Sequence, residues 1–207
     1  MNEFDDRARS WDEDLARSDM ARAVARAVCA RVPVNVSMHM LEYGCGTGLL
    51  SFALSDSLGH VTLADSSPGM LAVCAEKINA AGAANMAPLL LDLAAGPPPA
   101  RQYDLICTQM TLHHVEDVDA VLRAFGAMVR PGGYVCIADL DTEDGSFHGA
   151  DFKGHRGFDR AALKARAEAA GLTPCSCDTC HVLRRTRGAG VREYSLFLLV
   201  CRREAAR

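Results

Sequence analysis

The segment whose composition points most directly to chemistry is Glu42-Tyr43-Gly44-Cys45-Gly46-Thr47-Gly48. Glycines allow the backbone to turn sharply and to approach a ligand without an intervening Cβ. The segment lies between a short β-rich run and a helical pattern over residues 49–58, and open parallel sheets bind ligands at the carboxyl ends of their strands. A dinucleotide-binding loop spaces its glycines as G-x-G-x-x-G, whereas here the third glycine comes one residue early. The segment therefore predicts a ligand-binding loop whose spacing disfavours a dinucleotide.

Polar residues also end the next predicted strands. Asp65 lies 21 residues after Gly44, near the spacing at which an acid meets a ribose. Asp92 and Gln109 end the two predicted strands that follow. These side chains are expected at the same edge of the sheet as the glycine-rich segment.

Histidines provide the candidates for proton transfer. His113 and His114 follow the fourth predicted strand, where an active site would sit. Either one suits a general base or a group that orients an acceptor, because an ordinary histidine titrates near neutral pH. The alternative is that they only cap the next helix or line the pocket.

Residues 141–157, after the fifth predicted strand, have the composition of a lid, with hinge glycines, two phenylalanines and two histidines. Their carboxylates and imidazoles could also hold a metal ion, but they show no fixed ligand spacing. A solvated polar loop is the simpler interpretation, and we expect no metal site.

The nine cysteines include a cluster that resembles part of a zinc or metalloid site, Cys175, Cys177 and Cys180. The cluster falls inside a predicted strand, where Cys175 and Cys177 share one face and Cys180 points to the other. No second ligand pair lies at a supporting spacing. We therefore interpret the cysteines as reduced thiols that serve as small apolar side chains.

Five β-rich runs alternate with helical patterns, which is typical of parallel strands joined by crossover helices. The runs cover residues 38–43, 60–64, 86–91, 103–108 and 134–138. The clearest helix is expected over 115–130, stopped by Pro131-Gly132-Gly133, and a later helix is expected from near Asp159 to Gly171.

Two further strands are expected at 173–183 and 191–201, joined by a polar turn over 184–190. So short a connection requires an antiparallel pair. The sequence thus predicts an α/β fold with an open seven-stranded sheet, mostly parallel with an antiparallel last strand, and helices on both faces.

Upstream of the sheet, Met20, Val24 and Val28 predict an amphipathic helix, and the arginines Arg17, Arg22 and Arg26 face elsewhere. This helix is expected to pack on the sheet or to cover the mouth of the pocket.

Composition limits the class of protein. A chain of 207 residues suffices for one sizeable core. Its net charge of −4, with no basic half, argues against a protein that grips nucleic acid or an anionic membrane. The first twenty residues lack the apolar region of a secretory signal, and no apolar run approaches the roughly 20 residues of a membrane span. We expect a soluble, cytoplasmic protein.

The pattern acid-x-Gly-x-Gly-x-Gly resembles the cofactor loop of the class I S-adenosylmethionine-dependent methyltransferases. The resemblance continues in the family's order through the strand-end motifs, which are Ala64-Asp65-Ser66-Ser67, Leu89-Leu90-Leu91-Asp92-Leu93, Tyr103-Asp104-Leu105-Ile106-Cys107-Thr108-Gln109, Leu112-His113-His114-Val115 and Arg130-Pro131-Gly132-Gly133. It covers about residues 36–140. It implies a Rossmann-like fold, S-adenosyl-L-methionine as cofactor and S-adenosyl-L-homocysteine as product.

The resemblance also implies roles for individual positions. Asp65 takes the place of the acid that bonds both ribose hydroxyls, Asp92 accepts from the adenine amino group and the Leu93 amide reads the ring. Gln109 lies next to the methionine moiety. The cofactor-binding residues implied in this way are Glu42, Gly44, Cys45, Gly46, Gly48, Asp65, Ser66, Met70, Asp92, Leu93 and Gln109.

Two outer segments extend the resemblance. Phe4 to Asp12 matches the F-x-x-x-A-x-x-W-D opening of relatives in the ubiquinone/menaquinone-biosynthesis branch, where it helps to cover the cofactor. A plain packing role for Trp11 is the alternative. In the family the connection after the fifth strand shapes the acceptor pocket. The acceptor contacts implied are Trp11, Asp141, Phe147 and His148.

These features imply a single methyltransferase domain over residues 1–207, with an N-terminal helical cap (1–35), a cofactor-binding core (36–140), a lid-like loop (141–157) and a closing helix and hairpin (158–207). The expected reaction is in-line methyl transfer to a small-molecule acceptor, for which positioning is the main requirement. A base is needed only if the acceptor carries a proton, and the candidates are His113, His114 and His148.

Two other classes of protein remain open. One is a catalytically silent S-adenosylmethionine-binding regulatory or assembly protein. The other is a nicotinamide-dependent oxidoreductase, which the early third glycine and the closing hairpin disfavour. The expected partner is a small-molecule methyl acceptor, with no nucleic acid and no membrane, and the chain is expected to be a monomer or a homodimer.

Overall fold

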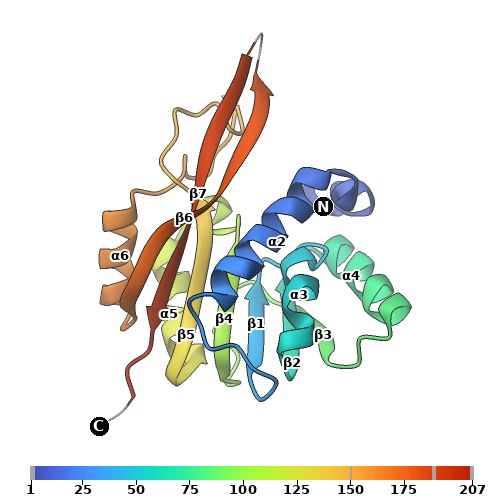
Figure 1. Cartoon of the computed structure of the whole chain (residues 1–207), viewed down its shortest axis with the longest axis vertical. Helices are drawn as coiled ribbons and strands as arrows, with labels where there is room; N and C mark the ends of the chain where they lie inside the picture. Colours follow the sequence, from blue (N-terminus) through green and yellow to red (C-terminus); the bar gives the residue numbers. More distant parts are fainter. Residues whose placement is uncertain (1–2, 150, 188–189, 206–207) are drawn as a thin grey trace.

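The computed structural model describes residues 3–149, 151–187 and 190–205, and a seven-stranded sheet forms its centre (Figure 1). The strands are β1 (His39–Tyr43), β2 (His60–Asp65), β3 (Met86–Leu90), β4 (Tyr103–Gln109), β5 (Val129–Leu140), β6 (Thr173–Arg187) and β7 (Gly190–Arg202). They lie in the order β3-β2-β1-β4-β5-β7-β6. Strands β1 to β5 are parallel, and β7 runs antiparallel to β5 and β6. The predicted fold class is confirmed, including its antiparallel last strand.

Helices cover both faces of this sheet. The helices are α1 (Glu3–Arg7), α2 (Leu15–Cys29), α3 (Leu49–Leu54), α4 (Pro68–Ala81), α5 (Val118–Met128) and α6 (Arg160–Ala169). Helices α2, α3 and α4 pack on one face, and α5 and α6 pack on the other. Alternate strand residues divide between the two cores, with Met40 and Cys107 on the first face and Leu41 and Ile106 on the second.

Helix α2 has the amphipathic pattern expected of it. Met20, Val24 and Val28 are buried against the sheet, and Arg22 and Arg26 are exposed. Arg17 behaves differently from the other two arginines, because it is half-buried and its guanidinium lies 3.8 Å from the ring centroid of Trp11. The helix therefore packs on the sheet and also contacts the short 3-10 helix η1 (Ala8–Glu13) that precedes it.

The helix expected over 115–130 is shorter than predicted. Asp117 accepts a hydrogen bond from the Ala120 amide and fixes the start of α5 at Val118. The two histidines before it form a separate 3-10 turn, η3 (Leu112–His114). The segment Pro131-Gly132-Gly133 does not end the helix, since β5 has already begun at Val129 and the three residues form an irregularity in its pairing with β4.

The closing hairpin is longer than predicted. Its strands pair as far as Arg187 and Gly190, so the turn expected over 184–190 is mostly strand, and residues 188–189 lie outside the described part. The extension rises past the sheet beside the loop after β5 (Figure 1). Contacts from that loop hold it there, because Ser146 Oγ lies 2.7 Å from Tyr194 Oη and Asp144 pairs with Arg192.

Within the described residues, every helix is too short or too polar to cross a membrane.

Candidate functional site

A cavity of about 1050 Å³ opens at the carboxyl ends of β1, β2 and β4. Residues of the N-terminal segment and of the loop over 141–157 also line it. Most of the residues predicted to bind the cofactor line it: Glu42, Gly44, Cys45, Gly46, Asp65, Ser66, Met70, Asp92 and Gln109. Gly48 and Leu93 do not line it. Gly48 caps α3 with a φ of 85°, and Leu93 is buried in the second core.

The glycine-rich segment makes its turn with positive φ angles, 71° at Gly44 and 53° at Gly46. A Cβ on Gly44 would lie 2.3 Å from the side chain of Thr111, which donates a hydrogen bond back to the Gly44 carbonyl. A Cβ on Gly46 would point toward Trp11 and Met70 at the cavity wall. The segment thus presents bare backbone to the cavity, as the sequence predicted.

Asp65 braces this backbone from the end of β2. One carboxylate oxygen accepts from the Gly46 amide and the other from the Ser67 amide, each at 2.8 Å. Burial raises the pKa of Asp65, and these hydrogen bonds oppose that effect. Carboxylate oxygens hold about four lone-pair sites, so two amide bonds leave acceptor capacity toward the cavity.

Glu42 has a structural function that the sequence did not reveal. Its side chain is 2% exposed, and Oε2 accepts hydrogen bonds from the Ser51 amide at 2.9 Å and from Ser51 Oγ at 2.5 Å. Ser51 lies in the first turn of α3, so Glu42 caps that helix from the neighbouring strand. Burial raises the pKa of Glu42 to about 8, although the Ser51 bonds lower it.

Gln109 carries an acceptor without a partner. Its Oε1 is buried, and none of the described residues donates a hydrogen bond to it. Gln109 lines the cavity at the end of β4. A buried amide oxygen of this kind is costly unless a ligand or water satisfies it, so a ligand with a donor group would fit beside it.

Hydrogen bonds and an ion pair hold the N-terminal segment against the glycine-rich loop and the start of α4. Asp12 accepts from Thr47 Oγ1 at 2.5 Å and pairs with Lys77 Nζ at 2.6 Å, and Lys77 also donates to the Thr47 carbonyl. Asp5 accepts from Ser67 Oγ at 2.6 Å. Phe4 and Trp11 line the cavity from this segment. The covering role that the resemblance implied for this segment stays a prediction, and the sequence did not indicate the Asp12–Lys77 pair.

A buried histidine that lines the cavity is hydrogen-bonded to a buried aspartate behind it. His113 and Asp139 are each 0% exposed, and His113 Nδ1 lies 2.6 Å from Asp139 Oδ1. The hydrogen bond to a carboxylate places the imidazole proton on Nδ1. His113 Nε2 is then an acceptor, it is buried, and no described residue bonds to it. Asp139 was not predicted, since an acid inside a buried strand shows no distinguishing pattern.

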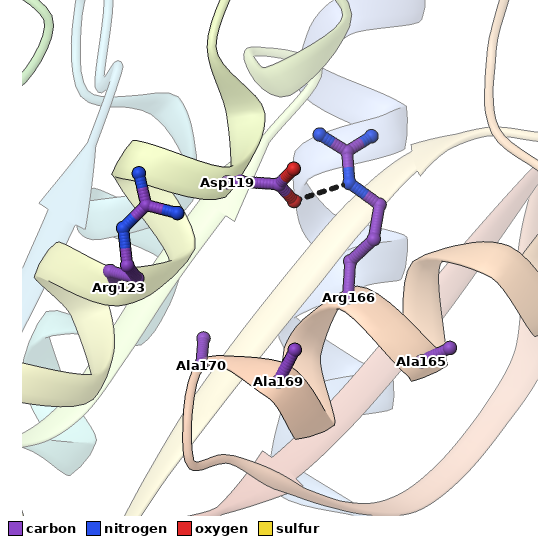
Figure 2. A pocket seen from close by; sticks show the side chains of 6 residues that line it. All are labelled: Asp119, Arg123, Ala165, Arg166, Ala169 and Ala170. Atoms are coloured by element: carbon purple, nitrogen blue, oxygen red, sulfur yellow. Dashed lines mark hydrogen bonds and ion pairs between the residues drawn. The ribbon is translucent and has the colours of Figure 1, made fainter.

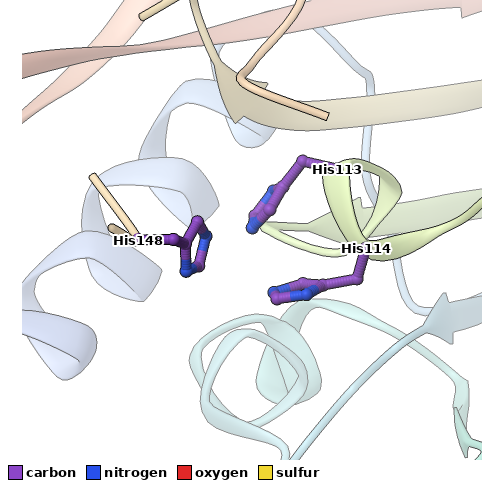
Figure 3. Close-up of side chains that lie close together, drawn as sticks. All are labelled: His113, His114 and His148. Carbon is purple, nitrogen blue, oxygen red and sulfur yellow. The ribbon is translucent and has the colours of Figure 1, made fainter. Parts of the chain in front are cut away.

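Two more imidazoles adjoin His113 (Figure 3). The ring centroid of His114 lies 4.3 Å from that of His113, and the centroid of His148 lies 5.0 Å from it. Burial, together with the neighbouring His113 and His148, lowers the pKa of His114 to about 3. The structure thus brings together the three histidines predicted as candidates from separate parts of the chain.

The loop over 141–157 supplies apolar contacts as well. Phe147 is 1% exposed and lines the cavity, with the Arg185 guanidinium 3.8 Å from its ring centroid. The Phe152 ring stacks on that of His148 at 3.9 Å. Asp141, by contrast, does not line the cavity. Its carboxylate forms a two-point ion pair with Arg160 at 2.6 and 2.7 Å, and its contact with an acceptor stays a prediction.

The cysteine cluster does not form a common site. Cys180 packs against the first core and Cys177 against the second, which places them on opposite faces as predicted, and Cys175 is exposed. All nine cysteines are free, and five of them are buried, Cys45, Cys74, Cys107, Cys136 and Cys201.

A smaller depression of about 340 Å³ lies between α5 and α6 (Figure 2). Three alanines and three charged side chains line it, and Asp119 is already paired with Arg166 at 2.6 Å. Because its walls are exposed and its acid is paired, this depression is a poor candidate for chemistry.

Comparisons with known proteins show which family the chain resembles in sequence. Residues 40–133 match a family model described as a methyltransferase domain. The chain is 35% identical over 133 residues to the biotin biosynthesis bifunctional protein BioCD of Bordetella avium, covering 62% of this chain and 27% of that protein. It is 30% identical over 135 residues to the ubiquinone/menaquinone biosynthesis C-methyltransferase UbiE of Pseudoalteromonas translucida, covering 63% of this chain and 54% of that protein. The chain therefore spans about a quarter of the length of the BioCD protein and about half of the length of the UbiE protein.

Solved structures share the fold. A chain from the complex of the Haloferax volcanii Trm112 methyltransferase activator superposes with a TM-score of 0.77 over 99% of both chains, at 18% identity. That similarity shows the architecture alone.

Proposed function

We propose that this chain, which belongs to the class I S-adenosylmethionine-dependent methyltransferases, transfers a methyl group from S-adenosylmethionine to a small-molecule acceptor. The observation that carries the proposal is the joint placement of Asp65 and the bare glycine backbone at one wall of a cavity whose remaining lining includes three histidines. The cofactor occupies the first wall and the acceptor the second.

The residues of the first wall fit the cofactor. Asp65 has acceptor capacity for ribose hydroxyls, and the unpartnered Gln109 Oε1 accepts from a donor such as an ammonium group. Asp92, at the end of the β3 region, is exposed to the cavity and supplies an acceptor for an adenine amino group. These three assignments follow the order of the family's strand-end motifs, and each rests on a side chain that lines the cavity.

The charge of the first wall also suits the cofactor. S-adenosylmethionine, when bound, supplies an electrophilic methyl group on a sulfonium. Glu42 and Asp65 lie at this wall, and a nearby cation favours the ionised form of a carboxylate. We expect binding of the cationic cofactor to release a proton from Glu42.

The second wall suits a small acceptor. Phe147, Phe152 and the three histidines face the part of the cavity beyond the glycine-rich loop, so a compact molecule with an apolar ring and a polar group would fit. The net charge of −4 does not favour nucleic acid. The curated relatives named above are proteins of biotin and quinone biosynthesis, which is in keeping with a small acceptor. We propose that the chain acts in the cytoplasm as a monomer or a homodimer.

The alternative is an S-adenosylmethionine-binding regulatory or assembly protein without an acceptor. A silent binder would need no polar space beyond the cofactor, whereas here the cavity continues to a buried histidine with an unsatisfied nitrogen. This observation favours the enzyme.

The proposal is tested by incubating the protein with methyl-labelled S-adenosylmethionine and a pool of cellular metabolites, followed by mass spectrometric identification of labelled products. We expect one small molecule to gain the label with the wild type and not with Asp65→Ala. Exposed Asp119 on α5 provides a matched control, and Asp119→Ala is expected to retain transfer. Binding of the cofactor with no labelled product in any pool would favour the silent binder.

A further inference from the structure

We propose that His113, His114 and His148 bind a divalent transition-metal ion, of the zinc class, in the acceptor half of the cavity. The site would be a second ligand site of this chain, and its role in methyl transfer rests on the function proposed above. The binding itself does not depend on that function.

Convergence of three imidazoles is the first observation. One ring nitrogen from each histidine lies within 4.8 Å of the others. His113 and His114 come from η3 and His148 from the loop after β5, and Figure 3 shows the three rings turned toward a common space. Imidazole nitrogens are ligands that zinc, copper, iron and nickel share, and three histidines with an open fourth position make a known type of catalytic zinc site.

The state of His113 is a second and independent observation. Its Nδ1 bonds to the buried Asp139, and Asp139 is held in turn by the Leu140 amide at 2.8 Å. Metal-binding histidines usually donate their second ring nitrogen to a carboxylate in this way, which fixes the tautomer and orients the ring. Burying His113 Nε2 without a hydrogen bond to any described residue is costly. A metal ion at that nitrogen would remove the cost.

The geometry requires a small closure on binding. Zinc–nitrogen distances of about 2.1 Å place tetrahedral ligands about 3.4 Å apart, so the nitrogens must approach by up to about 1.4 Å. His148 is exposed and lies on a loop, while His113 is fixed in the core. The movement therefore falls on His148, and the stacked Phe152 ring would move with it.

An open coordination position would face the acceptor. An acceptor with a thiol or phenol group would bind there as an anion and release its proton to solvent. Attack by the anion forms the bond to the methyl carbon, the carbon–sulfur bond of the sulfonium breaks, and its electron pair stays on sulfur. No oxidant or reductant is needed, and charge balances because the anion and the sulfonium neutralise each other.

The test is a titration of chelator-treated protein with Zn²⁺ and Co²⁺. We expect one ion per chain and a Co²⁺ spectrum of nitrogen coordination without a thiolate charge-transfer band. His148→Ala should lower the affinity by more than the roughly 10–100-fold that losing an outer-shell partner costs, and Asp139→Asn by about that amount. His60→Ala is the matched control, because His60 and His39 form an imidazole pair elsewhere, with centroids 5.6 Å apart. The affinity of the His60→Ala variant for Zn²⁺ and Co²⁺ should be unchanged.

Several results would overturn the site. They are the absence of a bound ion, a thiolate band that is lost on substitution of Cys175, Cys177 or Cys180, or an affinity that falls in His60→Ala and not in His148→Ala. His148 is exposed, so its variant should fold, and a melting curve checks this. S-adenosylmethionine binding by the same metal-free protein keeps the two proposals apart. Cofactor binding without metal binding contradicts only the metal site, and metal binding without cofactor binding contradicts only the methyltransferase.

Discussion

The buried carboxyl group of Glu42 should make the stability of this protein depend on pH in an unusual direction. The pKa of Glu42 is raised from 4.5 to about 8 by burial. Below pH 4.5 the group is protonated in both the folded and the unfolded chain. As the pH rises, the unfolded chain releases the proton first, so the free energy of unfolding falls until the folded group ionises near pH 8.

The size of the effect follows from the two pKa values. Each pKa unit corresponds to about 1.4 kcal/mol, so the full change, from well below pH 4.5 to well above pH 8, is about 5 kcal/mol. Glu42→Gln keeps an oxygen that can accept both Ser51 bonds but cannot ionise. The variant should therefore gain about 3.5 kcal/mol relative to the wild type between pH 5 and pH 8.

The assay is urea unfolding of both proteins at pH 5, 6, 7 and 8, with the difference in unfolding free energy plotted against pH. Taking the difference removes the contributions of the other titrating groups. Glu76→Gln is the matched control, because the Glu76 side chain is 60% exposed and its curve should stay parallel to that of the wild type. A constant difference between Glu42→Gln and the wild type would refute the reasoning.

Three further predictions concern the glycine turn, the N-terminal segment and the acceptor wall. Gly44→Ala should destabilise the protein by more than Gly82→Ala in thermal unfolding, because both positions have positive φ but only a Cβ at 44 meets a side chain, at 2.3 Å; equal costs would contradict the steric argument. Asp12→Asn should weaken the bonds to Lys77 and Thr47 and speed amide hydrogen exchange over residues 3–13, whereas the exposed Asp56→Asn should not; unchanged exchange would show that the segment is held by other contacts. His114→Gln should lower methyl transfer more than S-adenosylmethionine binding in paired assays, since His114 lies on the acceptor wall; an equal loss of both would place it with the cofactor.

Much of the sheet could be predicted because its strands are buried on both faces and read as short apolar runs. One wall of the cavity could be predicted as well, because the strand-end acids and the glycine-rich segment follow these strands and open parallel sheets bind ligands at the carboxyl ends of their strands. The extension of β6 and β7 could not be predicted, because Arg184 and Arg192 face solvent there and no apolar alternation marks the strands.

The acceptor wall was only partly predictable. The sequence indicated His113, His114 and His148 as candidates because histidines suit proton transfer. It did not indicate Asp139, which orients His113 and lies 26 residues away inside β5. Asp139 and Asp141 are equally acidic in sequence. Only the fold shows that the first bonds to a catalytic candidate and the second to Arg160.

Calorimetric titration with S-adenosylmethionine and S-adenosylhomocysteine tests the central claim most directly. The wild type and Asp119→Ala should each bind one equivalent of ligand, and Asp65→Ala should bind at least roughly tenfold more weakly while keeping a cooperative melting transition. No binding by the wild type, or the same affinity in Asp65→Ala, would contradict the account.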